Sequence, residues 1–393
     1  MTIEIRQLEL EESIKVLHFL SSYAFRPTPP LPEFEEYAER IRNRKGAKYY
    51  AVFEDGQPQA VSCATTPLIQ NIRGQLMKMG GVANVASHPA ARRRGYVRAL
   101  MHHMYQEFNQ ENYPVSCLYP FKESFYQRLG YVTLPQAKKI SFDPRNLGQV
   151  MKMELPGSVD MVSFQEGYND FRNYLLKLQK TTHGMSLFSL ALPETAKDHK
   201  AWLVFARHQG EVIGVMNYII KDGMMNQTLT AYDFLFSNPL GKFLLLDWVA
   251  KHVDQVSKAE LVLMPELAGE ILATDIRPQF DGWFLAPMGR VISVPALAGL
   301  PSGTGEITVR VTDEDCAWNN GVWTLSSRDG KFEVSPADQP ACDLTIHGLT
   351  ALVYGAYDPD EFSLRGWGNP NTDQQQILRQ MFPPAIPFLL AMF

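Results

Sequence analysis

The stretch Met79–Leu100, MGGVANVASHPAARRRGYVRAL, decides how we interpret the rest of the chain. Its first half carries apolar residues without a helical period, which predicts a strand. His88-Pro89 ends that strand, because proline cannot donate to the ladder and restricts the residue before it. A helix then runs from about Tyr96 to Phe108, and its apolar face consists of Leu100, Met101, Met104, Tyr105 and Phe108.

A strand, a short basic loop and a helix together favour the binding of an anion. The first N–H groups of a helix have no partner within it and point toward whatever lies in front. Gly95 has no Cβ, so a phosphate can approach the backbone closely. Arg92, Arg93 and Arg94 add positive charge. The alternative is a solvated basic helix start, but the strand before and the helix after favour a phosphate site.

Length and composition narrow the class of protein. A chain of 393 residues predicts two or three domains, and 45% hydrophobic with 20% charged residues is typical of a soluble globular protein. The net charge of −5 argues against a nucleic-acid binder. No apolar run approaches the ~20 residues that a membrane span requires, and the acidic start MTIEIRQLELEE predicts no signal peptide. We expect a cytoplasmic protein without a metal, because Cys63, Cys117, Cys316 and Cys342 lack metal-ligand spacing.

The chain before Met79 has the order of elements strand, two helices and then strands. The Asp55-Gly56 pair predicts a hairpin turn. We expect another strand pair to begin with Ile69–Met77 and to lead into Met79–Ser87. The other predicted elements are a strand at Ile3–Leu8, helices at Glu11–Tyr23 and Glu33–Arg44, and hairpin strands at Tyr49–Glu54 and Gln59–Thr65.

A second region repeats this pattern. The segment AVFEDGQPQAV at 51–61 compares with LVFARHQGEVIGV at 203–215, and Gly241–Val256 repeats the long helix. The residues before that helix, Ser237–Lys242, contain no run of arginines. We therefore expect one working cofactor site and one copy kept for structure. The alternative is that any α/β domain contains such a hairpin and helix.

The last part of the chain has a different character. Short strands separated by turns, followed by helices near Thr350–Tyr354 and Asp373–Met381, resemble a sterol-carrier-like domain. The tail Pro383–Phe393 contains three prolines and ends in apolar residues. We expect it to be buried and to bring the α-carboxylate of Phe393 into the interior, where a charge needs a partner or a function. The alternative is that the tail only covers the third domain.

Two motifs resemble those of the GCN5-related N-acetyltransferases (GNAT). The sequence Arg92–Val97, RRRGYV, is similar to their pyrophosphate motif Arg/Gln-x-x-Gly-x-Gly/Ala, with valine at the last position. After a predicted strand at Val115–Tyr119, the segment FYQRLGY, 125–131, resembles Tyr-x-x-x-Gly-Tyr/Phe, in which the tyrosine lies beside the acetyl thioester. Ser124 is a candidate cap for a one-turn helix that ends at Gly130.

Over its full length the chain resembles the Eis (enhanced intracellular survival) family. The resemblance implies an α/β (α+β) fold with two fused GNAT domains and a sterol-carrier-like domain, which we place at 1–145, 146–288 and 289–393. Only the first domain would bind acetyl-CoA. Tyr126 would be the general acid and the C-terminal carboxylate of Phe393 the general base. The implied cofactor-binding residues are Val85, Ala86, Ser87, Arg93, Arg94, Gly95, Tyr96, Val97, Arg98, Phe121 and Lys122.

The resemblance also implies a reaction and an assembly. Family members acetylate amines of aminoglycosides or lysine side chains, and they form hexamers. The expected function is therefore acetyl-CoA-dependent N-acetylation of primary amines through a ternary complex, with aminoglycosides as one class of acceptor. The alternatives are acetylation of a lysine side chain on a protein, and a non-catalytic scaffold that binds CoA or a lipid.

Overall fold

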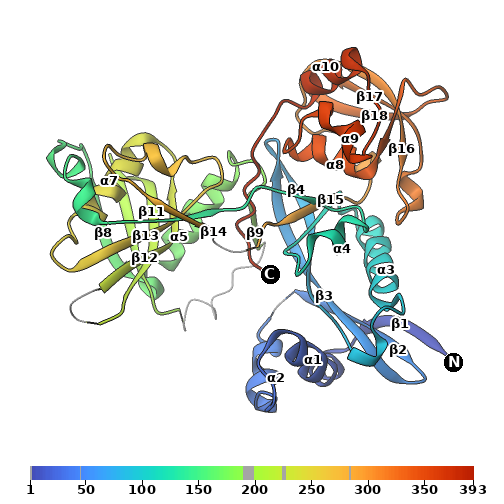
Figure 1. Ribbon diagram of the computed structural model, residues 1–393, viewed down its shortest axis with the longest axis horizontal. Helices are drawn as coiled ribbons and strands as arrows, with labels where there is room; N and C mark the ends of the chain where they lie inside the picture. Colours follow the sequence, from blue (N-terminus) through green and yellow to red (C-terminus); the bar gives the residue numbers. More distant parts are fainter. Residues whose placement is uncertain (1, 45, 189–198, 224–226, 283–284) are drawn as a thin grey trace. The chain divides into compact units, whose positions relative to one another are not determined.

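The computed structural model describes residues 2–44, 46–188, 199–223, 227–282 and 285–393 (Figure 1). Contacts group the chain into two units. The first combines Met1–Leu134 and Pro287–Phe393 with the short segment His183–Ala191, and the second consists of Pro135–Thr182 and Leu192–Ala286. Within the described residues, no helix is long and apolar enough to cross a membrane.

The first unit contains an eight-stranded sheet in the order β1-β2-β3-β4-β5-β15-β6, with β9 paired to β3. Neighbouring strands in this sheet are antiparallel except β4 and β5, which run parallel and are connected through a helix. The strands are β1 (Ile3–Leu8), β2 (Ala47–Glu54), β3 (Gln57–Ile72), β4 (Gln75–Ser87), β5 (Val115–Leu118), β6 (Val132–Thr133), β9 (Ser186–Phe188) and β15 (Met288–Val291).

The helices of this part of the chain follow the predicted order. They are α1 (Leu10–Phe25), α2 (Phe34–Arg42), α3 (Tyr96–Gln110) and α4 (Glu123–Gln127). The predicted apolar face of α3 is confirmed, since all five of its residues are buried. Ser124 lies inside α4 and does not cap it: the N-cap residue is Lys122, without a side-chain hydrogen bond.

The strand pairing around Arg73 differs from the prediction. A strand over Ile69–Met77 was expected, but β3 continues to Ile72 and a tight turn at Arg73-Gly74 leads into β4. Both turn residues have positive φ, +53° and +94°. The side chain of Asn71 accepts a hydrogen bond from the Gly74 N–H (2.7 Å), which stabilises this turn. The apolar residues on both sides concealed it, because they continue the alternation of a single strand.

The second unit has a seven-stranded sheet in the order β14-β7-β13-β12-β11-β10-β8. It repeats the first: an antiparallel series leads to one parallel pair, β12 and β13, connected through α7 (Pro239–Ala250). This repetition confirms the predicted tandem fold. The strands are β7 (Lys138–Phe142), β8 (Ser158–Ser163), β10 (Trp202–His208), β11 (Glu211–Lys221), β12 (Gln227–Phe236), β13 (Val256–Leu263) and β14 (Gln279–Gly282), and α5 (Phe164–Gln179) follows β8.

One strand of each sheet comes from a distant part of the sequence. β7, which precedes residue 145, pairs with β13 in the second sheet, whereas β15 pairs with β5 in the first sheet. The contacts thus define two units, one of which joins both ends of the chain. The three domain ranges 1–145, 146–288 and 289–393 stay a prediction.

The C-terminal region forms a four-stranded sheet with helices. Its order is β18-β17-β16-β19, with β16 and β19 parallel. A single core cluster joins it to the first sheet, because Leu68 and Met79 share that cluster with Leu349 and Trp367. The elements are β16 (Glu306–Thr312), β17 (Gly321–Arg328), β18 (Lys331–Pro336), β19 (Cys342–Thr345), α8 (Ile346–Tyr354), α9 (Phe362–Arg365) and α10 (Thr372–Met381).

The apolar tail packs against the first unit, as predicted. Phe388, Leu389 and Ala391 are buried, whereas Met392 is 51% exposed. The Phe388 N–H donates to the carbonyl oxygen of His183 (2.9 Å). The Tyr119 hydroxyl donates to the carbonyl oxygen of Leu389 (3.1 Å). These bonds fix the tail in an extended form beside the sheet.

Candidate active site

The parallel strands β4 and β5 separate at one end. Their pairing runs from Met79↔Val115 to Val82↔Leu118. β5 ends there, but β4 continues to Ser87. The last residues of β4 therefore extend past the end of β5, and their backbone groups on that side are in a position to bond an extended ligand.

A bulge lies where the two strands separate. The register of β4 against β3 changes from Cys63↔Ala83 to Val61↔Ala86, so that two residues, Asn84 and Val85, face Ser62. Asn84 has a φ of +52°, a left-handed conformation that asparagine tolerates better than most residues. Bulges of this kind redirect side chains beside active sites. The sequence analysis did not single out Asn84, although a polar residue within an apolar strand was the available signal.

The basic loop and the start of α3 have the conformation of an anion-binding site. Arg93 and Gly95 both have positive φ, +64° and +84°. Gly95 is the N-cap residue of α3 and supplies no side-chain cap, so the first N–H groups of the helix are left for a ligand. A Cβ added at Gly95 would meet nothing within 4 Å, which means that space is open in front of the backbone.

A cavity of about 830 Å³ lies at this point. Four arginines line it, and the lining that the structure describes contains no aspartate or glutamate. Such a cavity favours an anionic ligand of cofactor size. The lining residues are Tyr23, Ala24, Phe25, Val85, Ala86, Ser87, Ala91, Arg92, Arg93, Gly95, Tyr96, Val97, Arg98, Phe121, Phe125, Arg128 and Leu129.

Most of the predicted cofactor-binding residues line this cavity. They are Val85, Ala86, Ser87, Arg93, Gly95, Tyr96, Val97, Arg98 and Phe121. Arg94 and Lys122 are not among the described lining residues. The Arg94 guanidinium is paired with the Glu54 carboxylate, its Nη1 lying 2.6 Å from Oε2. Its side chain is therefore held at the end of β2.

The cavity wall also contains aromatic residues that sequence analysis missed. Tyr23 and Phe25, at the end of α1, are exposed and line the cavity, as does Phe125 on α4. Exposed aromatic residues at the end of an amphipathic helix were the only signal in the sequence. The cavity therefore offers apolar surface together with its arginines.

Tyr126 lies behind this wall. Its side chain is 3% exposed, and it is not among the described lining residues. Its ring packs edge-on against Phe121 and Phe125, with centroid distances of 5.6 and 5.0 Å. Burial, together with the neighbouring Tyr131, raises the pKa of the Tyr126 phenol above its ordinary value. The phenol therefore keeps its proton at neutral pH, as a proton donor must.

The end of the tail lies beside the same pair of strands. The Phe393 and Tyr119 ring centroids are 5.8 Å apart. A Cβ added at Gly81 would lie 3.0 Å from Cδ2 of Phe393. Gly81 pairs with Cys117, one position before the last pair between β4 and β5. The ring of Phe393 thus packs next to the point where the strands separate.

The corresponding helix start in the second unit differs. The side chain of Asn238 accepts a hydrogen bond from the Gly241 N–H (2.9 Å), and Pro239 occupies the first turn of α7. One N–H group is bonded and another is absent, so fewer donors remain for an anion. The cavity beside it measures about 440 Å³ and is lined by Lys242 and Glu266, among others.

Comparisons with protein families agree with this geometry. Residues 4–134 match the family described as acetyltransferase (GNAT) domain, and residues 294–390 match the sterol carrier protein domain. No curated protein matches the chain. Residues 4–134 thus form a GNAT acetyltransferase domain and residues 294–390 a sterol carrier protein domain, as the sequence indicated.

Solved structures share the fold over its entire length. A probable N-acyltransferase from Enterococcus faecalis superimposes with a TM-score of 0.86 at 20% identity, covering 100% of both chains. A GCN5-related N-acetyltransferase from Anabaena variabilis gives 0.85 at 18%, again over 100% of both. Eis1 from Mycobacterium abscessus gives 0.77 at 16%, with the same coverage. The architecture is therefore Eis-like.

Proposed function

We propose that this protein transfers the acetyl group of acetyl-CoA to a primary amine, and that the reaction takes place in the first unit. The observation that carries the proposal is the junction of two features. The cavity with four arginines lies at the uncapped start of α3, and it includes Val85–Ser87, where β4 extends past β5. The first feature suits a diphosphate, and the second suits the extended arm that leads to the thioester.

Within this proposal each part of the chain has a definite role. Acetyl-CoA supplies the activated acetyl group. The backbone N–H groups of α3, with Arg93 and Arg98, bind its phosphates. The backbone of Val85–Ser87 orients the pantetheine arm by hydrogen bonds, in the way that β4 bonds a neighbouring strand. Phe121 packs against the end of that arm. These contacts hold the acetyl carbon near the point where β4 and β5 separate.

The proton transfers are assigned to two groups. The C-terminal carboxylate of Phe393 takes the proton that the attacking amine loses, directly or through a water. The Tyr126 phenol gives a proton to the departing sulfur, and its raised pKa keeps it protonated beforehand. The packing of Phe393 beside Gly81 supports the first role. The contact of Tyr126 with Phe121, a cavity residue, supports the second.

The class of amine is the finer part of the proposal. Aminoglycosides are one candidate, by the resemblance to the Eis family, and lysine side chains are another. The described cavity lining has no carboxylate to attract a polycation. Because this cavity is assigned to acetyl-CoA, its lining does not separate the two candidates, and the experiment below does. The same resemblance makes a cytoplasmic hexamer part of the proposal, which sizing of the purified protein would test.

The experiment measures release of the CoA thiol from acetyl-CoA with kanamycin, spermidine and a lysine peptide. Thiol release that depends on the acceptor would support the proposal and identify the class of amine. If no amine caused release, the protein would instead be a scaffold that binds CoA or a lipid.

A further inference from the structure

A fully buried arginine joins the C-terminal region to the cofactor cavity. Arg290, on β15, is 0% exposed. Its Nη2 donates to Oδ1 and Oδ2 of Asp313, at 2.7 and 2.8 Å. Its Nη1 donates to the carbonyl oxygen of Leu129, which lines the cavity. Removal of either partner of this buried pair would leave an uncompensated charge. The folded structure therefore requires both residues.

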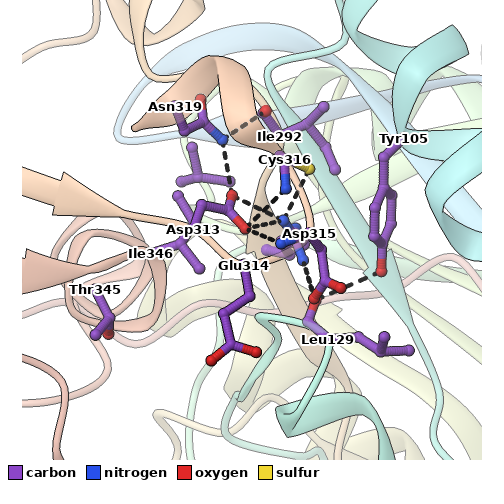
Figure 2. A network of polar contacts seen from close by, with 12 residues as sticks. Tyr105, Leu129, Ile292, Asp313, Glu314, Asp315, Cys316, Asn319, Thr345 and Ile346 are labelled. Carbon is purple, nitrogen blue, oxygen red and sulfur yellow. Dashed lines mark hydrogen bonds and ion pairs between the residues drawn. The ribbon is translucent and has the colours of Figure 1, made fainter. Parts of the chain in front are cut away.

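Asp313 in turn organises the loop that follows it. Its Oδ1 accepts hydrogen bonds from the N–H groups of Asp315 and Cys316, each at 3.1 Å. Its Oδ2 accepts one from Nδ2 of Asn319 (2.9 Å), whose side chain also donates to Ile292 (Figure 2). The loop is thus bonded on both sides, and Asp315 is held by its N–H bond to Asp313 and by an ion pair between its Oδ2 and Nη1 of Arg290 (3.6 Å).

Asp315 reaches from this loop to the cofactor helix. Its carboxylate is only 2% exposed. Its Oδ1 accepts hydrogen bonds from Nε and Nη2 of Arg98, at 3.0 and 2.9 Å, and it also contacts the His102 ring. Burial alone would raise the pKa of Asp315, but its bonds with His102 and Arg98 and the charge of Arg290 lower it below its ordinary value. Asp315 is therefore ionised at neutral pH.

These contacts restrict a residue of the cavity wall. Arg98 is in the first turn of α3 and lines the cavity. Its contacts with Asp315 use Nε and Nη2, and they leave Nη1 for an anion. An arginine side chain has many rotamers, and a ligand that must order it loses affinity. Asp315 orders the side chain before a ligand arrives.

We propose that Asp315 is a positioning residue for the cofactor diphosphate, which makes the sterol-carrier-like region part of the acetyl-CoA site. It holds the guanidinium of Arg98 at the start of α3, with one edge directed toward the phosphate. The charges of Arg290 and Arg98 balance those of Asp313 and Asp315, so Arg98 contributes oriented N–H donors, and the net attraction for the phosphate comes from Arg92 and Arg93. Glu314 adds one negative charge 3.5 Å from Arg98, but it is 87% exposed and is screened by solvent. The inference rests on the proposed placement of acetyl-CoA.

The test is calorimetric titration of CoA, which requires no acceptor. We expect Asp315→Asn to weaken CoA binding ~5-fold and Arg98→Ala ~10-fold, as is typical of charged contacts at a binding site. The double variant should bind as weakly as Arg98→Ala alone, because Asp315 acts only through Arg98. In turnover, Asp315→Asn should raise KM for acetyl-CoA and leave kcat within about twofold, since binding alone is affected.

The matched control is Asp343→Asn, which removes an exposed partner of Arg310 in the same region (3.2 Å) and should not change CoA affinity. Arg98→Lys keeps the charge but not the two-bond contact, and it should weaken binding ~3-fold. This second variant lies on the surface side of the network, so it tests the proposal even if Asp315→Asn does not fold.

Two outcomes would overturn the inference. One is parent-like CoA affinity in folded Asp315→Asn or in Arg98→Lys. The other is an additive loss in the double variant, which would give Asp315 a purely structural role. If the parent protein itself did not bind CoA, the proposed cofactor site would fail instead. Binding of CoA without turnover on any amine would remove the proposed reaction and leave the role of Asp315 intact.

Discussion

The two large sheets of this protein share an antiparallel series that leads to one parallel pair, but the helices that connect those pairs begin differently. In the first unit α3 begins at Gly95 without a side-chain cap, after a loop of three arginines. In the second unit α7 begins with Asn238 bonded to the Gly241 N–H and with Pro239 in its first turn. The first arrangement presents donors to a ligand, whereas the second satisfies or removes them within the chain.

This difference teaches that the anion site depends on capping chemistry and not on topology. Both helices follow a strand that pairs in parallel with the next one. The cavity with four arginines lies at the start of α3, whereas the described lining of the cavity beside α7 contains no arginine. The same topology can therefore carry two chemically different helix starts, through a few residues. The predictions below test this contrast, beginning with the largest expected effect.

The tail should be the most sensitive element, because it packs beside the strands of the first copy. We expect a few residues added after Phe393 to abolish turnover while CoA still binds, since the extension removes the carboxylate at that position. Thiol release and CoA titration measure the two properties. An extension before residue 1 is the control and should have no effect. Full activity of the extended protein would return the tail to a packing role.

A substitution of Tyr126 should lower turnover, whereas the matched substitution in the second unit should not. We expect Tyr126→Phe to lower kcat at least ~10-fold with CoA affinity unchanged, because the departing sulfur loses its proton donor. Tyr218→Phe in the second unit is the matched control: that tyrosine is also buried, and its hydroxyl contacts the Met161 sulfur (3.3 Å). Equal rates for Tyr126→Phe and the parent would exclude Tyr126 from the mechanism.

Substitutions of the loop arginines should lower the affinity for CoA, whereas the matched substitution in the second unit should not. We expect Arg92→Gln with Arg93→Gln to weaken CoA binding ~10-fold and to reduce its dependence on salt, because charge-assisted bonds to phosphate are lost. Lys242→Gln, at the corresponding helix of the second unit, should leave CoA affinity unchanged. A comparable loss from Lys242→Gln would mean that the second copy also binds the cofactor.

The cap of the second copy should affect stability alone. We expect Asn238→Ala to lower the free energy of unfolding by about 1 kcal/mol, the usual effect of losing an N-cap. Turnover and CoA affinity should remain those of the parent. Denaturant unfolding checks the first expectation, and thiol release checks the second. A loss of turnover without a loss of stability would contradict the structural role of this copy.

Sequence patterns predicted the parts of the site that are local. The arginine loop, Gly95 and the buried face of α3 are contiguous, so spacing alone revealed them. The bulge at Asn84 was missed, because it arises from the register between two strands. The aromatic residues Tyr23 and Phe25 in the cavity wall were missed too. Sequence alone does not show which residues an exposed apolar side chain lies beside. The assignments of Tyr126 and Phe393 stay predictions.

The features that sequence could not reveal are those between distant residues. Arg290 is an ordinary arginine in the sequence, and only tertiary structure brings Asp313 and Leu129 to it. The pairing of β15 with β5 joins residues that precede and follow the entire second unit in the sequence. No periodicity encodes such a contact, because patterns report the face of an element and not its partner.

The position of β15 has a consequence for biosynthesis. Strand β5 emerges from the ribosome long before Met288–Val291, the segment that pairs with it. Until then the nascent chain has an unpaired strand edge at β5, which favours aggregation or binding by a chaperone. The sheet that contains the candidate active site is thus translated mostly first, but its pairing is completed only after the entire second unit has been made.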